Sequence, residues 1–379
     1  MPGGHFGCRV FCFKILLLTK FSVLETVASQ SKATNKPKTI DWINNLKVIS
    51  LFAVIVLHTA SLLLMDYKKA PLNDWLVADF YNALVRFAVP VFVMISGTLL
   101  LHREYELGDF LKRRLTRVIW PFLFWSFVYI GYSWYNEDIA FTNDAWANIH
   151  IVLHQLKYGA FYHLWYMYML IGLYLFIPVI SKFVQHATEK EILYFLIVWF
   201  VVTAFSQPYL SRFQPQIDVH YFIGYLGYLV LGHYLASKEL PQGIKTPLVI
   251  YFFICLIGIT IGTYFISVNN KDLSTVMYEP LGPFIILFSS GIFLLARVTV
   301  FKLPQSLVKI RDLAGGLTLG IYLCHALFLV LIDQWWGISY KLCNPIFSIP
   351  LTALVCFILS FLLIFIISKI PFIGKFIVG

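Results

Sequence analysis

The stretch "DWINNLKVISLFAVIVLHTASLLL" (residues 41–64) is an almost continuous apolar run that carries a lysine, Lys47, near its start and a histidine, His58, deep inside. An apolar run of about 20 residues is long enough to cross the hydrocarbon core of a membrane as a helix. Ionisable side chains in lipid cost roughly 2.5–3.5 kcal/mol each on insertion scales and are therefore rare there. The stretch predicts a membrane-spanning helix whose histidine either has a chemical role or is satisfied by a helix carbonyl.

Similar apolar runs recur along almost the whole chain, and the composition agrees with them. Of 379 residues, 59% are hydrophobic and 13% are charged, which leaves too little polar surface for a soluble domain of this size. The runs are continuously apolar rather than alternating, which disfavours strands. We therefore expect an all-α, polytopic membrane helix bundle with about ten transmembrane helices. These helices are expected at about 44–65, 80–101, 118–135, 164–182, 191–207, 220–236, 246–267, 280–297, 314–333 and 346–368.

The net charge of +10 is compatible with nucleic-acid binding, with anionic ligands or with basic cytoplasmic loops, and the positions of the basic residues decide between them. With ten spans, the loops on the side of the two termini hold nineteen Lys and Arg residues, whereas the opposite loops hold six. The six are Lys68, Lys69, Lys157, Arg212, Lys271 and Lys341. Because basic loops stay inside, both termini are expected in the cytoplasm, and no nucleic-acid partner is implied.

Residues 1–39 fit this scheme poorly, because "VFCFKILLL" is too short to span a membrane and is interrupted by Lys14. A signal peptide is one alternative, since a basic start, an apolar core and the small residues of "TVASQ" follow one another. The basic segment "KATNKPKT" that comes next should stay inside, so we expect a dispensable or misassigned N-terminal extension instead. Residues 40–379 are expected to form a single membrane domain.

Neither the six cysteines nor the histidine pair in "HIVLH" predicts a metal site. Three cysteines lie in apolar runs, two in the N-terminal stretch and one, Cys343, in a loop, which is neither a disulfide framework nor a zinc pattern. His150 and His154 have metal-ligand spacing on a helix, but no third ligand is evident. The sequence also lacks a Walker motif, a dinucleotide fingerprint and a serine nucleophile elbow, which argues against an ATP-driven pump and an ordinary hydrolase.

Lys47 and His58 are eleven residues apart, which on a helix is three turns plus about 20°. They therefore share one helix face, with roughly 16 Å between them along the axis. The lysine is expected near the cytoplasmic surface and the histidine near or beyond the midplane. Histidine accepts and returns a proton near neutral pH, which makes His58 a candidate catalytic base.

The segment "DFLKRRLTRVIWPF" (109–122) concentrates basic residues at the cytoplasmic side. We expect a short interfacial helix over 108–119, with the third span starting at Pro121 and Trp120 outside helical geometry. On a helical wheel Arg113, Arg114 and Arg117 fall within about 100° of arc, so they can grip phosphates bidentately. The alternative is that they anchor the loop to anionic lipid headgroups.

Three further segments carry candidate polar groups inside or beside spans. "RFAVPVFVMISGTLL" (86–100) begins with Arg86 in the outer part of span two, where an arginine can also simply snorkel. "YHLWYMYMLIGLYLFIP" (162–178) has aromatic residues behind His163 at the outer face, which fit either an anchoring belt or a sugar-binding surface. "LGIYLCHALFL" (319–329) places a second intramembrane imidazole, His325, in span nine.

Taken together, these stretches resemble the acyltransferase-3 family of integral membrane O-acyltransferases over roughly residues 40–379. Lys47 and His58 match the family's basic-residue-x10-His motif, in which Arg is commoner than Lys, and Arg114 and Arg117 match its Arg-x-x-Arg motif. "VFVMISGTLLL" is similar to its Ser-Gly turn, the two histidine-bearing stretches above to its fourth- and ninth-span signatures, and "IPFIGKFIVG" to its ending. "FYHLWY" and "VPVFVMISG" are similar to the branch that includes the enterobacterial common antigen O-acetyltransferase.

The resemblance implies an O-acetyltransferase of the bacterial cytoplasmic (inner) membrane that moves an acetyl group from cytoplasmic acetyl-CoA, its co-substrate, to a sugar hydroxyl of a cell-surface or lipid-linked glycan. Arg113, Arg114 and Arg117 would hold the phosphates of acetyl-CoA, and Lys47 would handle the donor or orient the bundle. His58 would act as a general base or carry the acetyl group as an acyl-imidazole. The residues expected at the acceptor are Arg86, His163, Trp165, Tyr166 and His325. No metal is implied.

A transporter or flippase of a glycan-lipid intermediate is the alternative function, since ten spans and intramembrane charge also suit transport. The absence of detectable inverted repeats and the concentration of arginine in one cytoplasmic patch argue against it. A third hypothesis is a structural membrane subunit whose histidines are only core residues.

Overall fold

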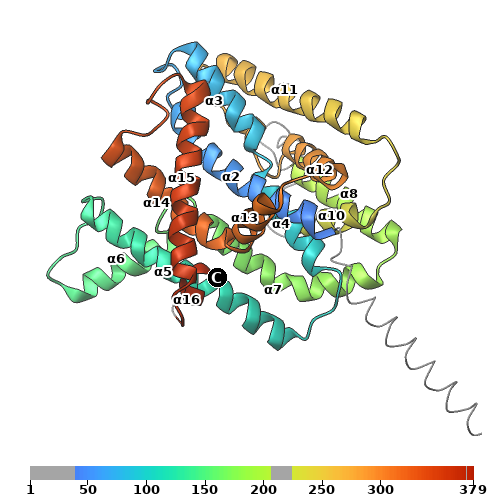
Figure 1. The fold of residues 1–379 in the computed structure, drawn as a ribbon, viewed down its shortest axis with the longest axis horizontal. Helices are drawn as coiled ribbons and strands as arrows, with labels where there is room; N and C mark the ends of the chain where they lie inside the picture. Colours follow the sequence, from blue (N-terminus) through green and yellow to red (C-terminus); the bar gives the residue numbers. More distant parts are fainter. Residues whose placement is uncertain (1–38, 206–223, 373) are drawn as a thin grey trace, which may run out of the picture. The chain divides into compact units, whose positions relative to one another are not determined.

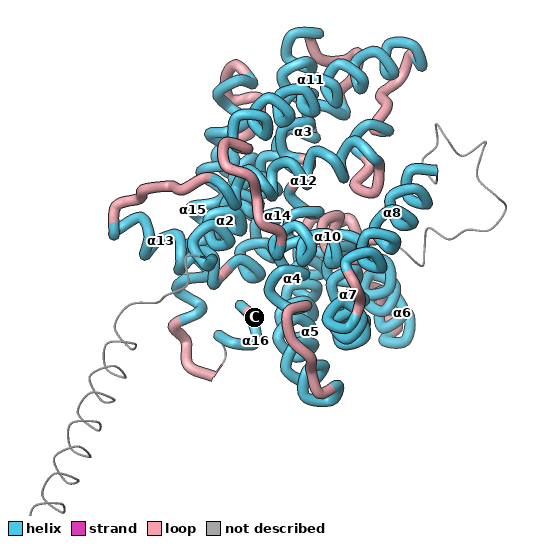
Figure 2. The backbone as a smooth tube through the Cα atoms, turned by 90° about the vertical axis from the view of Figure 1, so that its right-hand side faces the viewer, coloured by secondary structure: helices cyan, strands magenta, loops and turns pink. Residues whose placement is uncertain are grey.

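The computed structural model of the protein describes residues 39–205, 224–372 and 374–379. It divides into two units, Met1–Trp42 and Ile43–Gly379, and the features below belong to the second unit. Within the described ranges every regular element is a helix and none is a strand, which confirms the expected all-α class (Figure 2). Residues 1–38 of the expected N-terminal extension lie outside the described residues, so that expectation stays a prediction.

The helices follow one another along the chain as labelled in Figure 1. In order they are α2 (Thr39–Met65), α3 (Leu72–Val85), α4 (Ala88–Leu100), α5 (Leu107–Tyr135), α6 (Ala145–Tyr158), α7 (Trp165–His186), α8 (Glu189–Phe205), α10 (Leu226–Ser237), α11 (Lys245–Asn270), η2 (Val276–Tyr278), α12 (Pro283–Val298), α13 (Gln305–Gly316), α14 (Thr318–Trp336), α15 (Pro345–Ser368) and α16 (Gly374–Val378).

Seven described helical stretches are long and apolar enough to cross a membrane, which confirms a polytopic membrane protein. They are Asp41–Met65, Leu72–Leu100, Trp165–His186, Lys245–Asn270, Val276–Val298, Thr318–Trp336 and Pro345–Ser368. Of the other three expected spans, 118–135 lies inside α5, whereas 191–207 and 220–236 run into residues 206–223, which are not described. The number ten and the side of the termini therefore stay predictions.

Helix α5 corrects the expected arrangement around Pro121. A short helix ending before a new start at Pro121 is wrong, because α5 runs without a break from Leu107 to Tyr135 with that proline inside it. Tertiary contacts beyond the proline support the helix: Trp125 Nε1 donates to Ile377 O at 3.2 Å, and Tyr129 Oη donates to Leu323 O at 2.8 Å. These bonds fix the part of α5 beyond Pro121 against its neighbours, although the proline removes one hydrogen bond within the helix itself.

The N-terminus of α5 is capped by an acidic side chain. Glu106 accepts the backbone N–H groups of Asp109 at 2.6 Å and Gly108 at 3.1 Å. These two amides hold the pKa of the Glu106 carboxyl below its ordinary value, because they stabilise its charged form. The cap fixes where the helix begins, and with it the direction in which the arginines of its second and third turns project.

Helix α13 was not expected from the sequence, and it packs against the N-terminal end of α2. Asn44 Nδ2 donates to Asp312 Oδ1 at 3.0 Å, and Arg311 Nη1 donates to Asn45 Oδ1 at 3.1 Å. Arg311 is buried, so these polar contacts satisfy a charge that would otherwise be costly to bury. The C-terminal end of α13 is thereby held next to Lys47.

Helices α4 and α10 cross at unusually close range, because glycine lies at the contact on both of them. A Cβ atom built on Gly97 would lie 1.9 Å from Leu229 O, and one built on Gly232 would lie 2.1 Å from Met94 O. Thr98 Oγ1 also donates across the crossing to Gly232 O at 3.1 Å. Small residues of this kind let membrane helices pack backbone to backbone.

We predict that Gly97→Ala weakens this crossing, because the added methyl group meets backbone atoms that have no room to move. Overpacking of this kind lowers the free energy of unfolding by about 1–3 kcal/mol. The effect is measured as a lower midpoint of thermal unfolding for the purified protein in detergent.

The matched control is Gly258→Ala on α11, where an added Cβ would meet nothing within 4 Å. That variant should unfold at the wild-type temperature or slightly above it, since alanine favours a helix over glycine. Equal midpoints for the two variants would contradict the close crossing.

The predicted topology is tested by labelling with a membrane-impermeant thiol reagent. Cysteine at position 109 should be protected in intact cells, whereas cysteine at position 144 should react, because the two positions flank a predicted span. The native Cys343 is exposed and lies in a predicted outer loop, so the background for this experiment is Cys343→Ser. The reverse labelling pattern would invert the topology.

Candidate functional site

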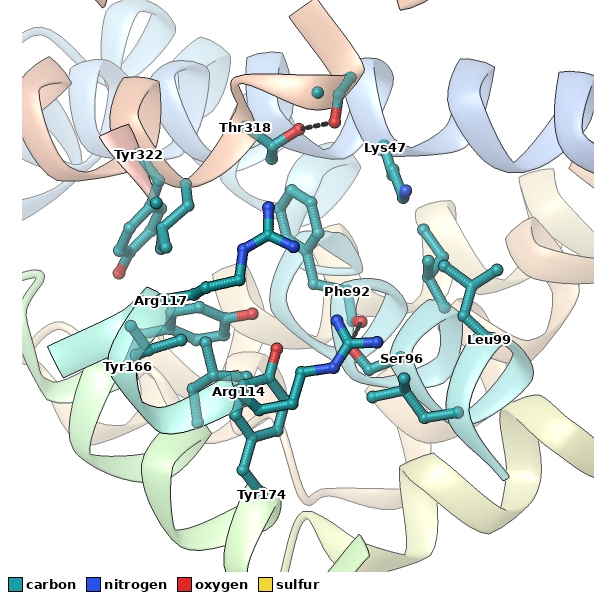
Figure 3. Close-up of a pocket in the computed structure, with 18 residues that line it drawn as sticks. Lys47, Phe92, Ser96, Leu99, Arg114, Arg117, Tyr166, Tyr174, Thr318 and Tyr322 are labelled. Carbon is teal, nitrogen blue, oxygen red and sulfur yellow. Dashed lines mark hydrogen bonds between the residues drawn. The ribbon is translucent and has the colours of Figure 1, made fainter. Parts of the chain in front are cut away.

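A cavity of about 480 Å³ lies among α2, α4, α5, α7 and α14, next to the end of α13. Three of its lining residues are basic, Lys47, Arg114 and Arg117, and none of the described residues that line it is acidic. Figure 3 shows the three basic side chains extending toward the same space, Lys47 from α2 and the two arginines from α5. We call this space the basic cavity. Its charge and volume suit an anionic ligand of small-molecule size.

Helix α5 positions the two arginines of the basic cavity. Arg114 and Arg117 are three residues apart and therefore project from the same helix face, one turn from each other. They also line a second hollow at the beginning of α5, together with Arg103 and Tyr105. The arginine pair thus stands between two adjoining hollows at one end of the helix bundle.

Arg113 does not line the basic cavity. Its Nη2 atom lies 3.1 Å from Asp109 Oδ2, and 78% of its side chain is exposed. It contributes instead to the second hollow at the start of α5. The helical-wheel argument grouped all three arginines correctly on one side of α5, but the pairing of Arg113 with Asp109 separates it from the other two.

Two tyrosines line the basic cavity at the side where it approaches a group of histidines. Tyr166 and Tyr322 have ring centroids 5.0 Å apart, and we call this pair the tyrosine wall. Tyr322 Oη donates to His163 O at 2.6 Å, and the Tyr322 ring lies 5.5 Å from that of His325. The wall therefore contacts the cavity through one side and the histidines through the other.

Three histidines from different parts of the chain pack together behind the tyrosine wall. The ring centroids of His58 and His325 are 5.3 Å apart with the planes inclined by 28°, and those of His325 and His163 are 5.1 Å apart. We call these residues the histidine cluster. His163 and His325 are fully buried, whereas His58 keeps part of its surface accessible.

The hydrogen bonds of the two buried histidines define which nitrogen carries the proton. His325 Nδ1 donates to Tyr322 O, and His163 Nε2 donates to Leu323 O at 3.3 Å, since a carbonyl oxygen only accepts. In the neutral rings, His325 Nε2 and His163 Nδ1 are then free to accept. Both atoms are buried and have no hydrogen-bond partner among the described residues. Unpartnered buried nitrogens point to a polar occupant beside them.

The residues expected around the acceptor are distributed over four places, and Arg86 is at one of them, at the end of α3 over the ring of Tyr278. His163 was expected at the outer face, but the turn before α7 folds inward, and the ring packs against Tyr129 at 5.2 Å as well as against His325. Tyr166 lines the basic cavity. Trp165 is 44% exposed and lies 6.1 Å from the ring of Tyr225, apart from both groups.

His58 and Lys47 lie at two different centres. Lys47 lines the basic cavity, whereas His58 belongs to the histidine cluster and is absent from the cavity lining. Tyr322 stands between the two centres, and sequence reasoning did not single it out. A signal for it existed, since it lies three residues before His325 on the same helix, and so on the same face. Tyr162, whose ring is 4.9 Å from that of His58, was likewise missed.

No group of three or more His, Cys, Asp or Glu side chains within the described part of the chain could hold a metal ion. His150 and His154 both lie exposed on α6.

Comparison with known proteins identifies the family of the chain. The model of the acyltransferase-3 family, described as "Acyltransferase domain", matches residues 40–369. A protein of Bacillus subtilis (strain 168) named as a membrane-bound acyltransferase, YfiQ, is 24% identical over 304 residues, which cover 76% of this chain and 80% of that protein. No solved structure matches the chain. With the family model covering most of its length, the chain belongs to the acyltransferase-3 family and is a membrane acyltransferase.

Proposed function

We propose that the protein is an O-acetyltransferase that moves an acetyl group from cytoplasmic acetyl-CoA to a sugar hydroxyl of a cell-surface or lipid-linked glycan. The observation that carries this proposal is the position of the basic cavity, which abuts the histidine cluster across the tyrosine wall. An anion-binding site directly next to proton-accepting imidazoles suits transfer from a phosphate-bearing donor. We place this reaction in the bacterial cytoplasmic (inner) membrane, with both termini inside.

The donor occupies the basic cavity. Arg114 and Arg117 bind phosphate oxygens of coenzyme A through their planar, multi-donor guanidinium groups, and Lys47 adds a third positive charge from the opposite helix. Arg113 lies at the edge of this site and contributes through the second hollow. The thioester end of the donor then points toward Tyr166 and Tyr322, beyond which the histidine cluster lies.

His58 carries the chemistry. As a general base it takes the proton from the acceptor hydroxyl, whose oxygen attacks the thioester carbonyl carbon. The carbon–sulfur bond then breaks, and coenzyme A leaves as a thiol with the proton that His58 returns. His58 is the best placed of the three rings, because it alone keeps an accessible surface. In the alternative route the ring nitrogen attacks first and carries the acetyl group as an acyl-imidazole.

The acceptor approaches from the outer side. Tyr162 is 53% exposed beside His58, and Trp165 lies exposed at the start of α7. Exposed aromatic rings of this kind stack on the CH-rich faces of sugars. The free nitrogens of His163 and His325 supply polar contacts to hydroxyl groups of the acceptor. The similarity of "FYHLWY" to acetyltransferases of surface glycans supports this choice of acceptor.

We predict that replacing both Arg114 and Arg117 with alanine weakens coenzyme A binding by about 100-fold or more, since each arginine would lose a hydrogen bond to a charged group, which contributes about 1.5–3 kcal/mol. The readout is the rise in unfolding temperature that coenzyme A gives the purified protein, which scales with occupancy. Arg113→Ala is the matched control and should keep most of that rise. An unchanged rise in the double variant would remove the phosphate-binding role.

We predict that His58→Ala lowers acetyl transfer by about 10²-fold to 10⁴-fold, the usual contribution of a general base. Transfer is measured with labelled acetyl-CoA and membranes that contain the endogenous glycan, without a membrane potential. The stabilisation by coenzyme A should persist, because His58 does not line the basic cavity.

The control for this second experiment is His154→Ala on the exposed face of α6, which should transfer at the wild-type rate. If the His58→Ala variant still transfers acetyl groups, His58 is only a core residue. Wild-type protein that needs a coupling ion and yields no labelled glycan would favour the transporter.

A further inference from the structure

A polar network that the mechanism above does not use lies between α2, α3 and η2. Its members are Ser61, Asp79, Asn82, Arg86 and Tyr278. Asp79 and Asn82 are fully buried on a stretch apolar enough to cross a membrane. Ionisable groups at such positions are costly and need a reason.

Tyr278 stands at the centre of the network. Its hydroxyl donates to the Asp79 carboxyl group and also approaches Asp79 O at 3.2 Å. The face of its ring lies 4.3 Å from the Arg86 guanidinium carbon, which is a cation–π contact. Tyr278 therefore links the carboxyl group to the guanidinium group, and it does so from a different part of the chain.

The Arg86 guanidinium group has more N–H donors than hydrogen-bond partners. Nη2 donates to Asn82 Oδ1 at 3.0 Å, whereas Nε is buried and has no partner among the described residues. No carboxylate of the described residues forms an ion pair with it. A guanidinium group is always charged, so a buried one with a free donor is prepared for an oxygen that carries negative charge.

The network also fixes the level of Arg86 relative to His58. Ser61 Oγ lies 3.0 Å from Asn82 Oδ1, which sets the register of α2 against α3. His58 lies one turn before Ser61 on α2, and Arg86 lies one turn after Asn82 at the end of α3. Because the two helices run in opposite directions, both steps lead toward the same end of the helix pair. His58 and Arg86 therefore lie at the same level of the helix pair.

We propose that Asp79 and Tyr278 are positioning residues that hold Arg86 beside His58, where its guanidinium group binds the thioester carbonyl oxygen as that oxygen becomes an oxyanion. When the acceptor oxygen bonds to the carbonyl carbon, the π electrons of the C=O bond move to the carbonyl oxygen. The N–H groups of Arg86 stabilise the negative charge that forms there. When the intermediate collapses, the electrons re-form the double bond and the carbon–sulfur bond breaks. Donors fixed in advance are effective at this step. The inference rests on the proposed function.

The decisive variant is Tyr278→Phe, which keeps the ring face under Arg86 and removes only the hydrogen bond to Asp79. We expect the apparent kcat of acetyl transfer to fall about 10-fold to 100-fold, because a small misplacement of a catalytic group has effects of this size. The apparent KM for acetyl-CoA should stay within about twofold, since Tyr278 does not line the basic cavity. Both values come from inside-out membrane vesicles given labelled acetyl-CoA over a concentration series.

Two pairs of variants show whether the effect runs through Arg86. Asp79→Asn keeps an oxygen that accepts the Tyr278 hydroxyl and should retain most of the kcat, whereas Asp79→Ala should match Tyr278→Phe. Arg86→Gln should lower kcat further, by about 10²-fold to 10³-fold. The matched control is Tyr81→Phe, which also removes a tyrosine hydrogen bond on α3, to Ile346 O at 2.8 Å, and should change neither value.

The outcomes separate this inference from the proposed function. If wild-type vesicles incorporate no label into glycan, the acetyltransferase proposal fails and this inference with it. If wild-type vesicles transfer and Tyr278→Phe transfers equally fast, the positioning role is wrong while the acetyltransferase stands. If Tyr278→Phe loses the stabilisation of the purified protein by coenzyme A, its role is in folding and the inference is overturned.

Discussion

The arrangement of the helices depends on one constraint, which is that polar groups inside a membrane must find their partners within the protein. Three imidazole rings meet this constraint only in part: they pack on one another, and His163 and His325 each donate one hydrogen bond to a backbone carbonyl of α14. Because the rings come from α2, the turn before α7 and α14, those three segments have to converge. Tyr129 of α5 joins the same point through its hydroxyl, which donates to Leu323 O and accepts from Leu327 N. The cluster thus ties three helices and the turn before α7 together.

The separation of the basic cavity from the histidine cluster has a chemical consequence. A phosphate-bearing donor is strongly hydrated and needs positive charge at the water-filled end of the bundle, whereas proton transfer at an imidazole is favoured where water is excluded. Tyr166 and Tyr322 stand where these two environments meet, and their hydroxyl groups and ring faces suit both. In the mechanism we propose, only the thioester end of the donor has to pass them.

The Arg86 network between α2, α3 and η2 shows the same principle. A carboxyl group, an amide, a guanidinium group and a phenol are brought together so that most of their polar atoms are paired. The atoms left without partners among the described residues, Asp79 Oδ2 and Arg86 Nε, are therefore informative. A fold that needed these groups only for packing would be more stable with apolar residues of the same size in their place.

Much of this could be predicted from residue spacing alone. Continuous apolar runs predicted the helices, because a membrane allows a spanning backbone few alternatives. Helical periodicity correctly placed Arg114 and Arg117 on one face of α5, and the apolar runs around His58 and His325 form candidate membrane spans. The family of the chain followed from the same residues, since its motifs are short and local.

Local pattern failed wherever a contact between distant segments decided the outcome. The sequence by itself determined which apolar segments are helical, which of them carry ionisable groups and on which face those groups lie, because these properties repeat every few residues along one chain. Only the tertiary structure decided that α5 continues through Pro121, that Arg113 leaves the other arginines, that His163 turns inward to meet His325, and that Tyr278 reaches Asp79. These outcomes depend on packing between helices, and the spacing within one helix carries no information about which neighbour will face it.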